Sequence, residues 1–322
     1  MVEFSACATT YNNAGRLKVC LDSVIKALAN LNFEIVIVDN YSIDGTYEII
    51  RHYAQRYSNI KVLRFKCSRG LGRQLAFENS SGRYIITIDT DTEYDSEKLQ
   101  KILMIYKQGK FGKLTAVKFW GSLGIYPRSL VEKAGGWRDY STAEDHDFLA
   151  RLCKVGSFVF LPINTEVNEP YEEWRDKGLL KALRFNIIVR EKRYFQGFPL
   201  IKRTFRNMVD EYCALGVTTH NLVIRHRYLR MGMHKTLLAV LLLLFSKIVN
   251  FSWKRSITYA DRDIHNAHYD YYNFIKNIVD PRKFGFEVES GPLFLDEHLK
   301  FVAALKPDIK ERLEFYFSQR VT

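Results

Sequence analysis

The chain has 322 residues, which is long enough for one large α/β domain with a smaller appendage. With 47% hydrophobic and 26% charged residues, its composition is that of a globular protein, which excludes a disordered chain. The five cysteines are scattered and show no CxxC spacing, so we expect reduced thiols in a cytosolic setting and no structural zinc site.

The first half of the chain alternates strand-like and helix-like patterns. Short runs of β-branched and aromatic residues predict buried strands, each followed by a polar turn and an amphipathic helix. This alternation predicts an α/β fold with right-handed crossovers and a mostly parallel sheet with helices on both faces. The expected strands are Glu3–Ala8, Phe33–Val38, Ile60–Phe65, Tyr84–Ile88 and Phe158–Leu161, and the expected helices are Ala14–Ala29, one ending near Tyr57, Gln74–Asn79, Ser96–Tyr106, Ser129–Ala134 and Phe148–Val155.

Polar and charged residues gather just after these strands. In an open parallel sheet, ligands bind outside the carboxyl ends of the strands. The set offers an aromatic face and a carboxylate for a base, arginines for phosphates and acids for a metal, which together describe a nucleotide diphosphate site. Its members are Thr9, Tyr11, Asn12, Asp39, Arg69, Arg73, Asp89 and Asp91. Gly70 and Gly72 do not form a dinucleotide fingerprint, because the third glycine is missing and they follow the third strand.

The turn Asp89-Thr90-Asp91 ends the fourth strand. Two carboxylates one residue apart, where a buried strand ends, repel each other and favour a compensating cation. A hard divalent ion, Mg²⁺ or Mn²⁺, prefers such oxygen ligands and keeps open positions for water or substrate phosphates. The alternative is that these acids, together with Glu93 and Asp95, only cap the next helix, although capping needs a single side chain.

Three segments of this half resemble the family 2 glycosyltransferases of the GT-A fold, in order and at the usual spacing. They read TTYNNAGRLKVCLDSVI, IVIVDNYSIDGTYEII and RGLGRQLAFENSSGRYIITIDTDTEY. The resemblance covers the chain from about Glu3 to Pro162. One departure is Asn40, where the family commonly has a second aspartate. Another follows the last predicted strand, where many relatives place a histidine; this chain has Asn164 to Glu169 there, with Glu169 as the only weak substitute for a third metal ligand.

The resemblance implies roles for the residues at the sheet edge. Tyr11 and Asp39 would hold the base of a nucleotide-sugar donor. Arg69 or Arg73 would hold its diphosphate. The two aspartates that end the fourth strand would be the DXD motif, which binds Mn²⁺ or Mg²⁺ as cofactor.

A second acidic motif is the pair Glu144-Asp145. The resemblance implies that this ED pair faces the acceptor, and that Asp145 is the general base that takes the proton of the acceptor hydroxyl. The structural alternative is that the acids are favoured by the dipole at the start of a helix. Trp137 is a candidate platform for stacking an acceptor sugar, with a buried aromatic as the alternative.

The second half carries most of the net charge of +12. Between Lys177 and Arg255, 16 basic residues stand against three acidic ones, which favours an anionic partner such as a membrane surface, a phosphorylated lipid or nucleic acid. Leu179–Tyr194 is typical of a basic amphipathic helix. Leu237–Phe245 is apolar all round but too short to span a bilayer, which takes roughly 20 residues. We expect a membrane-surface or partly embedded helix there; a buried or dimer-forming helix and an extended span are the alternatives.

These observations predict a metal-dependent inverting glycosyltransferase that moves a sugar from a nucleotide diphosphate donor to a glycan hydroxyl or a polyprenyl-lipid phosphate. Residues 1–170 would form the GT-A catalytic domain, and residues 171–322 a helical region that contacts the membrane or the acceptor. No leader pattern follows Met1, so we expect a cytoplasmic protein at the inner face of the cell membrane, with a homodimer left open.

Two other classes of protein were weighed. A non-catalytic nucleotide-sugar-binding or scaffold protein is disfavoured by the intact acidic motifs. A basic nucleic-acid binder is disfavoured because the positive charge is interleaved with aliphatic residues and the aromatics form no evident base-stacking platform.

Overall fold

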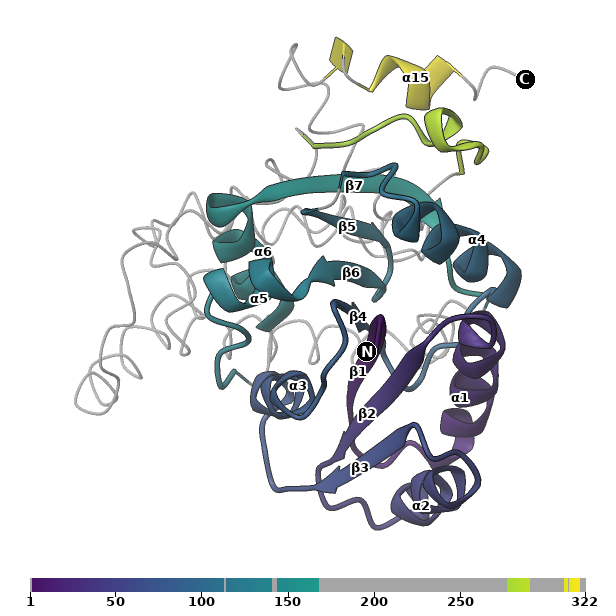
Figure 1. The fold of residues 1–322 in the computed structure, drawn as a ribbon, viewed down its shortest axis with the longest axis vertical. Coiled ribbons are helices and arrows are strands. Elements are labelled where there is room, and N and C mark those ends of the chain that lie inside the picture. The colour runs from purple at the N-terminus through teal and green to yellow at the C-terminus, as the bar shows by residue number, and fades with distance from the viewer. Residues whose placement is uncertain are drawn as a thin grey trace, which may run out of the picture. The chain divides into compact units, whose positions relative to one another are not determined.

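The structure is a computed structural model, and it describes residues 2–112, 114–140, 144–167, 277–289, 310–311 and 313–318. Its centre is a seven-stranded sheet in the order β3-β2-β1-β4-β6-β5-β7 (Figure 1). The strands are β1 Phe4–Thr10, β2 Phe33–Asp39, β3 Ile60–Arg64, β4 Tyr84–Thr87, β5 Thr115–Trp120, β6 Gly124–Pro127 and β7 Ser157–Asn164. The first four strands run parallel, as predicted, and β6 runs antiparallel to both of its neighbours.

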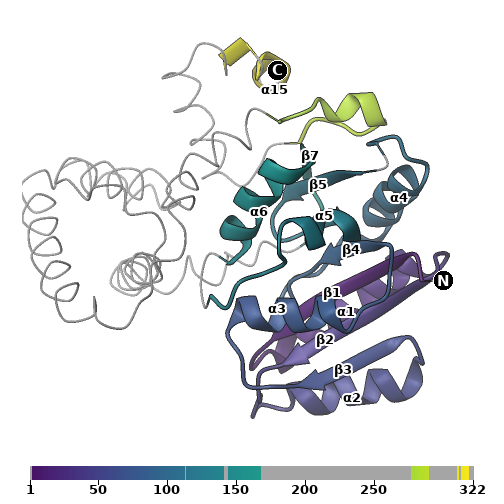
Figure 2. The ribbon, with the colours of Figure 1, turned by 60° about the vertical axis from the view of Figure 1, so that its left-hand side comes forward.

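Helices cover both faces of the sheet, which confirms the predicted layering. The helices α1, α2 and α4 lie on one face, and α3, α5 and α6 lie on the other (Figures 1 and 2). Their bounds are α1 Ala14–Leu28, α2 Thr46–Arg56, α3 Arg69–Glu78, α4 Ser96–Lys107, α5 Arg128–Lys133 and α6 Glu144–Val155. The helix α3 begins five residues before its predicted start, because the Ser68 side chain caps it by accepting a hydrogen bond from the Leu71 amide at 3.1 Å.

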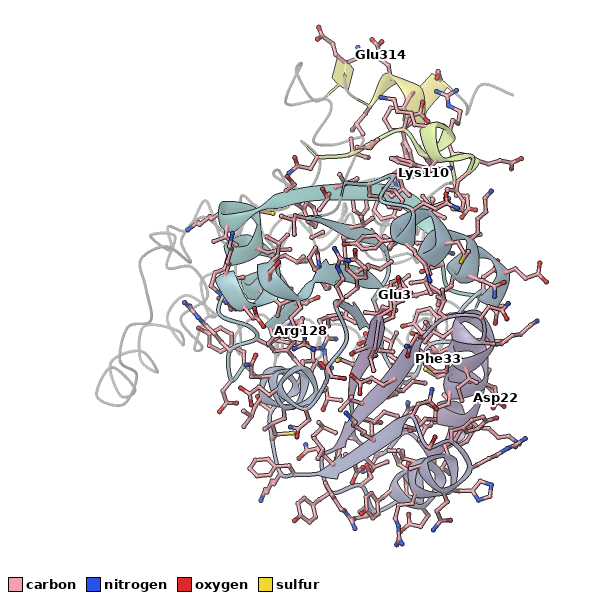
Figure 3. All side chains as sticks on the ribbon, in the orientation of Figure 1. Glu3, Asp22, Phe33, Lys110, Arg128 and Glu314 are labelled. Carbon is pink, nitrogen blue, oxygen red and sulfur yellow. The ribbon has the colours of Figure 1, made fainter. Side chains whose placement is uncertain are left out.

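The core forms because apolar side chains recur on one stripe of each helix and on both faces of the central strands. In α1, Leu17, Leu21, Val24 and Leu28 follow the helical repeat, and each is at most 1% exposed. Burying one such side chain stabilises the fold by about 2 kcal/mol. Side chains from the sheet and the helices meet on both faces (Figure 3). This packing fixes the strand ends that carry the candidate site.

The strand β1 lies at the point where the strand order reverses. It pairs with β2 on one side and with β4 on the other. The strands β2 and β3, which follow β1 in the sequence, therefore lie on one side of it, and β4 lies on the other side. At such a point the loops after two neighbouring parallel strands separate and leave room for a ligand. The loops after β1 and β4 are those with Tyr11 and with the Asp89-Thr90-Asp91 turn.

The strands β5 and β6 are absent from the predicted elements. β6 has four residues, Gly124–Pro127, bounded by a glycine and a proline, so its periodic signal is too short to be recognised. β5 is buried on both faces, and its sequence TAVKFW lacks the strict alternation that marks a half-buried strand.

A later segment returns to this sheet. Residues 277–289, with the 3-10 helix η2 at Pro281–Phe284, belong to the same compact unit as the N-terminal region, whereas the predicted boundary at residue 170 separates them. The Val279 amide donates to the Phe160 carbonyl of β7 at 3.0 Å, and the Phe284 ring lies 4.4 Å from that of Phe111. The short helix α15, Glu314–Phe317, lies in the region 171–322 that is predicted to be helical.

The basic and apolar segments predicted at Leu179–Tyr194 and Leu237–Phe245 lie outside the described residues. Among the helices that are described, none is long and apolar enough to cross a membrane.

Candidate functional site

The turn after β4 alternates outward and inward side chains. The Asp89 side chain is 41% exposed and Asp91 is exposed, whereas Thr90 and Thr92 are buried. Both carboxylates therefore lie on the outer side of the turn. Loss of solvation within the surrounding protein raises the pKa of the Asp91 carboxyl above its ordinary value, and repulsion by Asp89 raises it further.

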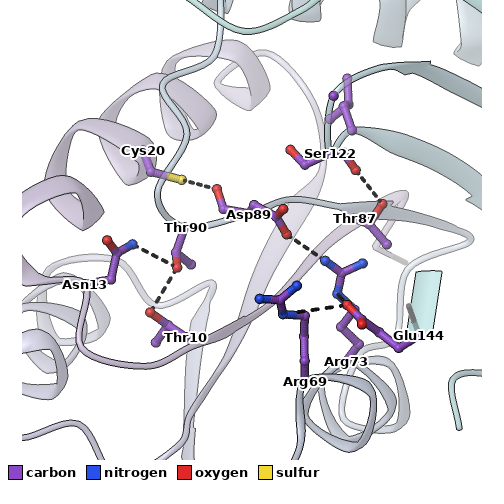
Figure 4. Close-up of polar contacts among 12 residues, drawn as sticks. Thr10, Asn13, Cys20, Arg69, Arg73, Thr87, Asp89, Thr90, Ser122 and Glu144 are labelled. Carbon is purple, nitrogen blue, oxygen red and sulfur yellow. Dashed lines mark hydrogen bonds and ion pairs between the residues drawn. The ribbon is translucent and has the colours of Figure 1, made fainter. Parts of the chain in front are cut away.

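The turn is clamped to the end of β1 and the start of α1 (Figure 4). The Thr90 hydroxyl donates to the Thr10 hydroxyl at 2.9 Å, and the Asn13 side-chain amide donates to Thr90 at 3.1 Å. The Cys20 thiol lies 3.4 Å from the Asp89 carbonyl oxygen. These contacts hold the two acids over the point where the strand order reverses.

Arg73 joins the two acidic motifs (Figure 4). Its Nη2 lies 2.7 Å from Asp89 Oδ1, and its Nε lies 3.6 Å from Glu144 Oε1. The Arg73 side chain is 8% exposed, so its guanidinium is enclosed between acids. Arg69 Nε lies 3.8 Å from the same Glu144 oxygen, but its side chain is 60% exposed. Of the two arginines predicted to bind the diphosphate, Arg69 is therefore the one that is open to solvent.

Glu144 is a buried carboxylate with an incomplete set of hydrogen bonds within the described residues. It is 1% exposed, and its Oε2 has no hydrogen-bond partner within the described part of the chain. Burial raises its pKa to about 6; attraction by Arg73 opposes this shift, and repulsion by Asp145 adds to it. Asp145 is half-buried next to it at the start of α6.

Two glycines bring α3 close to both motifs. Gly70 donates its amide to the Tyr140 carbonyl at 2.8 Å, and a Cβ at this position would collide with the backbone that leads to α6. A Cβ at Gly72 would collide with Thr9, whose hydroxyl donates to the Val38 carbonyl at 3.3 Å. These glycines therefore allow a close helix approach, which is consistent with their exclusion as a dinucleotide fingerprint.

The candidate base-binding residues lie around the ends of β1 and β2. Asp39 is fully buried; it accepts a hydrogen bond from the Ser42 amide at 3.1 Å and lies 3.3 Å from Arg64 Nε. Asn12 adopts a positive φ of 49° and donates its amide to the Ser42 hydroxyl at 2.9 Å. Tyr11 is 58% exposed. Of the two residues predicted to hold a base, Tyr11 is the one that presents its ring to solvent.

Trp137 is placed differently from the predicted sugar platform. It is 3% exposed, and its ring stacks on Phe148 at 4.1 Å with Phe77 and Tyr126 at its edges. The aromatic cluster covers the ring because the apolar side of α6 packs against β6 and α3. Trp137 is therefore a buried aromatic, as in the alternative interpretation of the sequence.

The family follows from a comparison with known proteins. A family model described as Glycosyl transferase family 2 matches residues 5–168, about half of the chain. This chain belongs to glycosyl transferase family 2. A second model, Glycosyl transferase family group 2, matches residues 94–260. The mostly parallel sheet with helices on both faces is the GT-A fold that the resemblance implied.

Relatives of this chain include the dolichol-phosphate mannosyltransferase of Pyrococcus furiosus, 30% identical over 110 residues that cover 34% of this chain and 31% of the relative. The poly(ribitol-phosphate) beta-glucosyltransferase of Bacillus spizizenii is 29% identical over 226 residues, 66% of this chain and 34% of the relative. The chain spans about a third of the length of these two curated relatives.

Among solved structures, S. aureus TarS 1-349 in complex with UDP aligns with a TM-score of 0.46 and 16% identity, covering 80% of this chain and 93% of that one. The mannosyltransferase PcManGT from Pyrobaculum calidifontis, in complex with GDP-Man and Mn²⁺, aligns with a TM-score of 0.45 and 15% identity, covering 84% and 87%.

The donor set of the turn Asp89-Thr90-Asp91 is compatible with a hard divalent ion. The described residues contain no group of three or more His, Cys, Asp or Glu side chains that could hold a metal. Two outward carboxylates are a sufficient donor set for an ion that completes its shell with water and substrate phosphates. The raised pKa of Asp91 reports an unfavourable negative charge, which a cation would relieve. Glu169, the weak candidate for a third ligand, lies outside the described residues.

One charged group near the site escaped the sequence predictions. Lys118 of β5 is 8% exposed and donates to the Leu123 carbonyl at 3.0 Å. Burial lowers its pKa to about 8, against the attraction of Asp145, Glu166 and Asp89. The sequence signal for this buried group is the single lysine within the largely apolar run TAVKFW.

Proposed function

We propose that this family 2 glycosyltransferase is a metal-dependent inverting enzyme that transfers a sugar from a nucleotide diphosphate donor to a hydroxyl or lipid-phosphate acceptor. The observation that carries the proposal is the bridge made by Arg73, which contacts Asp89 at 2.7 Å and Glu144 at 3.6 Å. It brings the acids suited to a donor-bound metal beside the acids suited to acceptor activation.

On the donor side, Tyr11 stacks on the base and Arg69 contacts the diphosphate. Asp91, with Asp89, holds a Mg²⁺ or Mn²⁺ ion. Once bound, the ion supplies positive charge to the departing nucleoside diphosphate. Arg73 keeps the Asp89 carboxylate in place.

On the acceptor side, Asp145 accepts the proton of the attacking hydroxyl. The acceptor oxygen bonds to the anomeric carbon while the bond from that carbon to the phosphate oxygen breaks on the opposite side, which inverts the anomeric centre. The electron pair of the broken bond leaves with the nucleoside diphosphate. If the acceptor is a lipid phosphate, it needs no base, and Asp145 positions it instead.

The experiment has a binding arm and a transfer arm. Titration calorimetry with UDP and GDP, in Mn²⁺ and in EDTA, measures whether a nucleotide binds and whether the metal strengthens its binding. A panel of nucleotide sugars with Mn²⁺ then measures the release of nucleotide. We expect one nucleotide to bind more tightly with metal and its sugar to be turned over. Full turnover in excess EDTA would contradict the metal role, and binding without release under any acceptor would favour the non-catalytic scaffold.

The location at a membrane is a separate part of the proposal. It rests on the sequence of the basic segment from Lys177 to Arg255, where each basic residue near an anionic leaflet is worth about 1 kcal/mol. Flotation with anionic and neutral liposomes at low and high salt tests it. Binding that salt removes indicates surface attachment, since salt screens charge but not apolar insertion. Binding that survives salt indicates insertion of Leu237–Phe245, and no flotation refutes membrane association.

A further inference from the structure

A chain of buried hydrogen bonds ends on the backbone of the aspartate turn. The Asp89 amide donates to the Tyr94 hydroxyl at 2.9 Å. The Tyr94 oxygen lies 2.7 Å from the Ser122 hydroxyl, which in turn donates to Glu166 Oε1 at 3.0 Å. Tyr94 is 1% exposed, so the chain is shielded from water at its centre. It links the ends of β4 and β7 through the turn between β5 and β6.

The direction of the chain follows from the donors available. Ser122 has one hydroxyl hydrogen and gives it to the Glu166 carboxylate, so the hydrogen between Ser122 and Tyr94 comes from the tyrosine. Every bond points from Asp89 toward one carboxylate, and bonds aligned in this way strengthen one another.

The backbone around Glu166 is shaped to accept this carboxylate. The Ser122 amide donates to Glu166 Oε1 at 2.7 Å. Gly121 has a φ of +79°, and a Cβ there would collide with the Glu166 carboxylate. Two backbone bonds join the segments on either side, from the Asp95 amide to the Thr165 carbonyl at 2.9 Å and from the Val167 amide to the Glu93 carbonyl at 2.8 Å. The Glu166 side chain is thereby fixed relative to Tyr94.

We propose that Tyr94, Ser122 and Glu166 are positioning residues that hold the Asp89 amide, and thereby keep the outward carboxylates of the aspartate turn in the geometry that binds the metal and the donor. The inference rests on the proposed function. A buried tyrosine needs a hydrogen-bond partner in any case, but a nearby backbone carbonyl would serve. Tyr106 is satisfied in that way, by the Thr115 carbonyl at 2.6 Å. The Tyr94 hydroxyl instead receives the amide of a candidate metal ligand.

The test compares Tyr94→Phe with Tyr106→Phe. Both substitutions remove one hydroxyl from a buried tyrosine, and only the first disconnects the turn. Hydrogen exchange of the peptide that spans residues 89–92 is measured without metal or donor, and Mn²⁺ affinity is measured with and without nucleotide. We expect faster exchange and about 10-fold weaker Mn²⁺ binding in Tyr94→Phe alone, since partners of metal ligands typically matter by 10–100-fold. Ser122→Ala, which removes the hydroxyl between Tyr94 and Glu166, should behave in the same direction.

Each outcome decides the matter. Unchanged exchange at residues 89–92 in folded Tyr94→Phe overturns the inference, and so does faster exchange with unaltered Mn²⁺ affinity. Equal effects of Tyr94→Phe and Tyr106→Phe on Mn²⁺ affinity also overturn it, because they would reflect general loosening. If the unmodified enzyme binds no metal, the metal part of the proposed function fails, and the claim that Tyr94, Ser122 and Glu166 position the metal and the donor fails with it. The exchange comparison still shows whether these hydrogen bonds order the turn.

Discussion

Glu34 at the amino end of the parallel strands and the acids Asp91 and Glu144 near the carboxyl end lie in opposite electrostatic environments. At the amino end, Glu34 of β2 accepts hydrogen bonds from the Ser5 hydroxyl at 2.7 Å and the Ser81 hydroxyl at 2.9 Å, and Lys61 lies 2.7 Å away. Burial alone would raise the pKa of Glu34, but these partners outweigh it and lower the pKa to about 2. At the carboxyl end, the pKa values of Asp91 and Glu144 are raised.

The contrast separates an acid whose charge the protein stabilises from acids whose charge it disfavours. At the amino end, Glu34 is supplied with hydrogen-bond donors and a lysine. Near the carboxyl end, Asp91 is repelled by Asp89, and one oxygen of Glu144 has no hydrogen bond within the described residues. Ionising these two groups therefore costs free energy in the folded protein. A cationic or hydrogen-bonding ligand recovers that cost, which makes the unfavourable arrangement useful for binding.

The largest effect is expected from Asp91→Asn, which removes the exposed acid at the carboxyl end. An asparagine binds the metal more weakly, so the negative charge of the departing nucleotide is less well neutralised, and transfer should fall by about 10³-fold, equivalent to about 4 kcal/mol. Metal-free stability should stay equal or rise, because the repulsion from Asp89 is relieved. Released-nucleotide assays and thermal denaturation measure the two quantities. The matched control is Glu97→Gln, an exposed acid in the first turn of α4; a similar loss of activity in that variant would argue against a specific role for Asp91.

At the amino end, Glu34 should govern acid stability. Its folded-state pKa of about 2 lies below the ordinary 4.5, so its stabilisation is present above pH 4.5 and is lost as the pH falls toward 2. The shift corresponds to about 3 kcal/mol. Glu34→Gln should therefore destabilise the protein by about this amount at pH 7. The free energy of unfolding of this variant should also fall less steeply than that of the unmodified protein as the pH is lowered from 4.5 to 2. Glu3→Gln is the control, because its pair with Lys107 at 2.8 Å is solvent-screened and worth less than about 1 kcal/mol.

Asp145→Asn should separate chemistry from binding. The amide keeps the shape of the side chain but accepts no proton, so turnover should fall by about 10²-fold, or about 2.7 kcal/mol, with donor affinity nearly unchanged. Steady-state kinetics together with nucleotide titration measure this split. A parallel loss of both quantities would point to a structural role at the start of α6. A lipid-phosphate acceptor would remove the need for a base, and the turnover of such an acceptor would then be far less affected.

The sequence was sufficient for the parallel half of the sheet, because each strand there is an apolar run that ends in a polar turn. The positions of Tyr11, Asp39 and the aspartate turn at strand ends follow from that pattern alone. The partners of these side chains do not, because they come from segments far apart in the chain. The enclosure of Arg73 between two acids depends on how closely α3 approaches α6, and no local pattern encodes that distance.

The environments of Trp137 and Glu34 depend on distant segments in the same way. For Trp137 the sequence leaves a sugar platform and a buried aromatic open, because its burial depends on Phe148 from the following helix. The donors around Glu34 come from β1, β3 and the loop before β4, so neither its burial nor its lowered pKa is visible in the residues next to it.

Glu144→Gln is the sharpest test of the comparison, since the same substitution at Glu34 should act with the opposite sign. The pKa of Glu144 is raised to about 6 from 4.5, so the folded protein resists its ionisation. That penalty is absent below pH 4.5, grows between pH 4.5 and 6, and is complete above pH 6. Glutamine resembles the protonated acid and should stabilise the protein at pH 7 by up to about 2 kcal/mol, with no gain at pH 4. Chemical denaturation at both pH values measures the difference. Equal destabilisation by Glu34→Gln and Glu144→Gln at pH 7 would mean that both ends of the sheet use their acids only for stability.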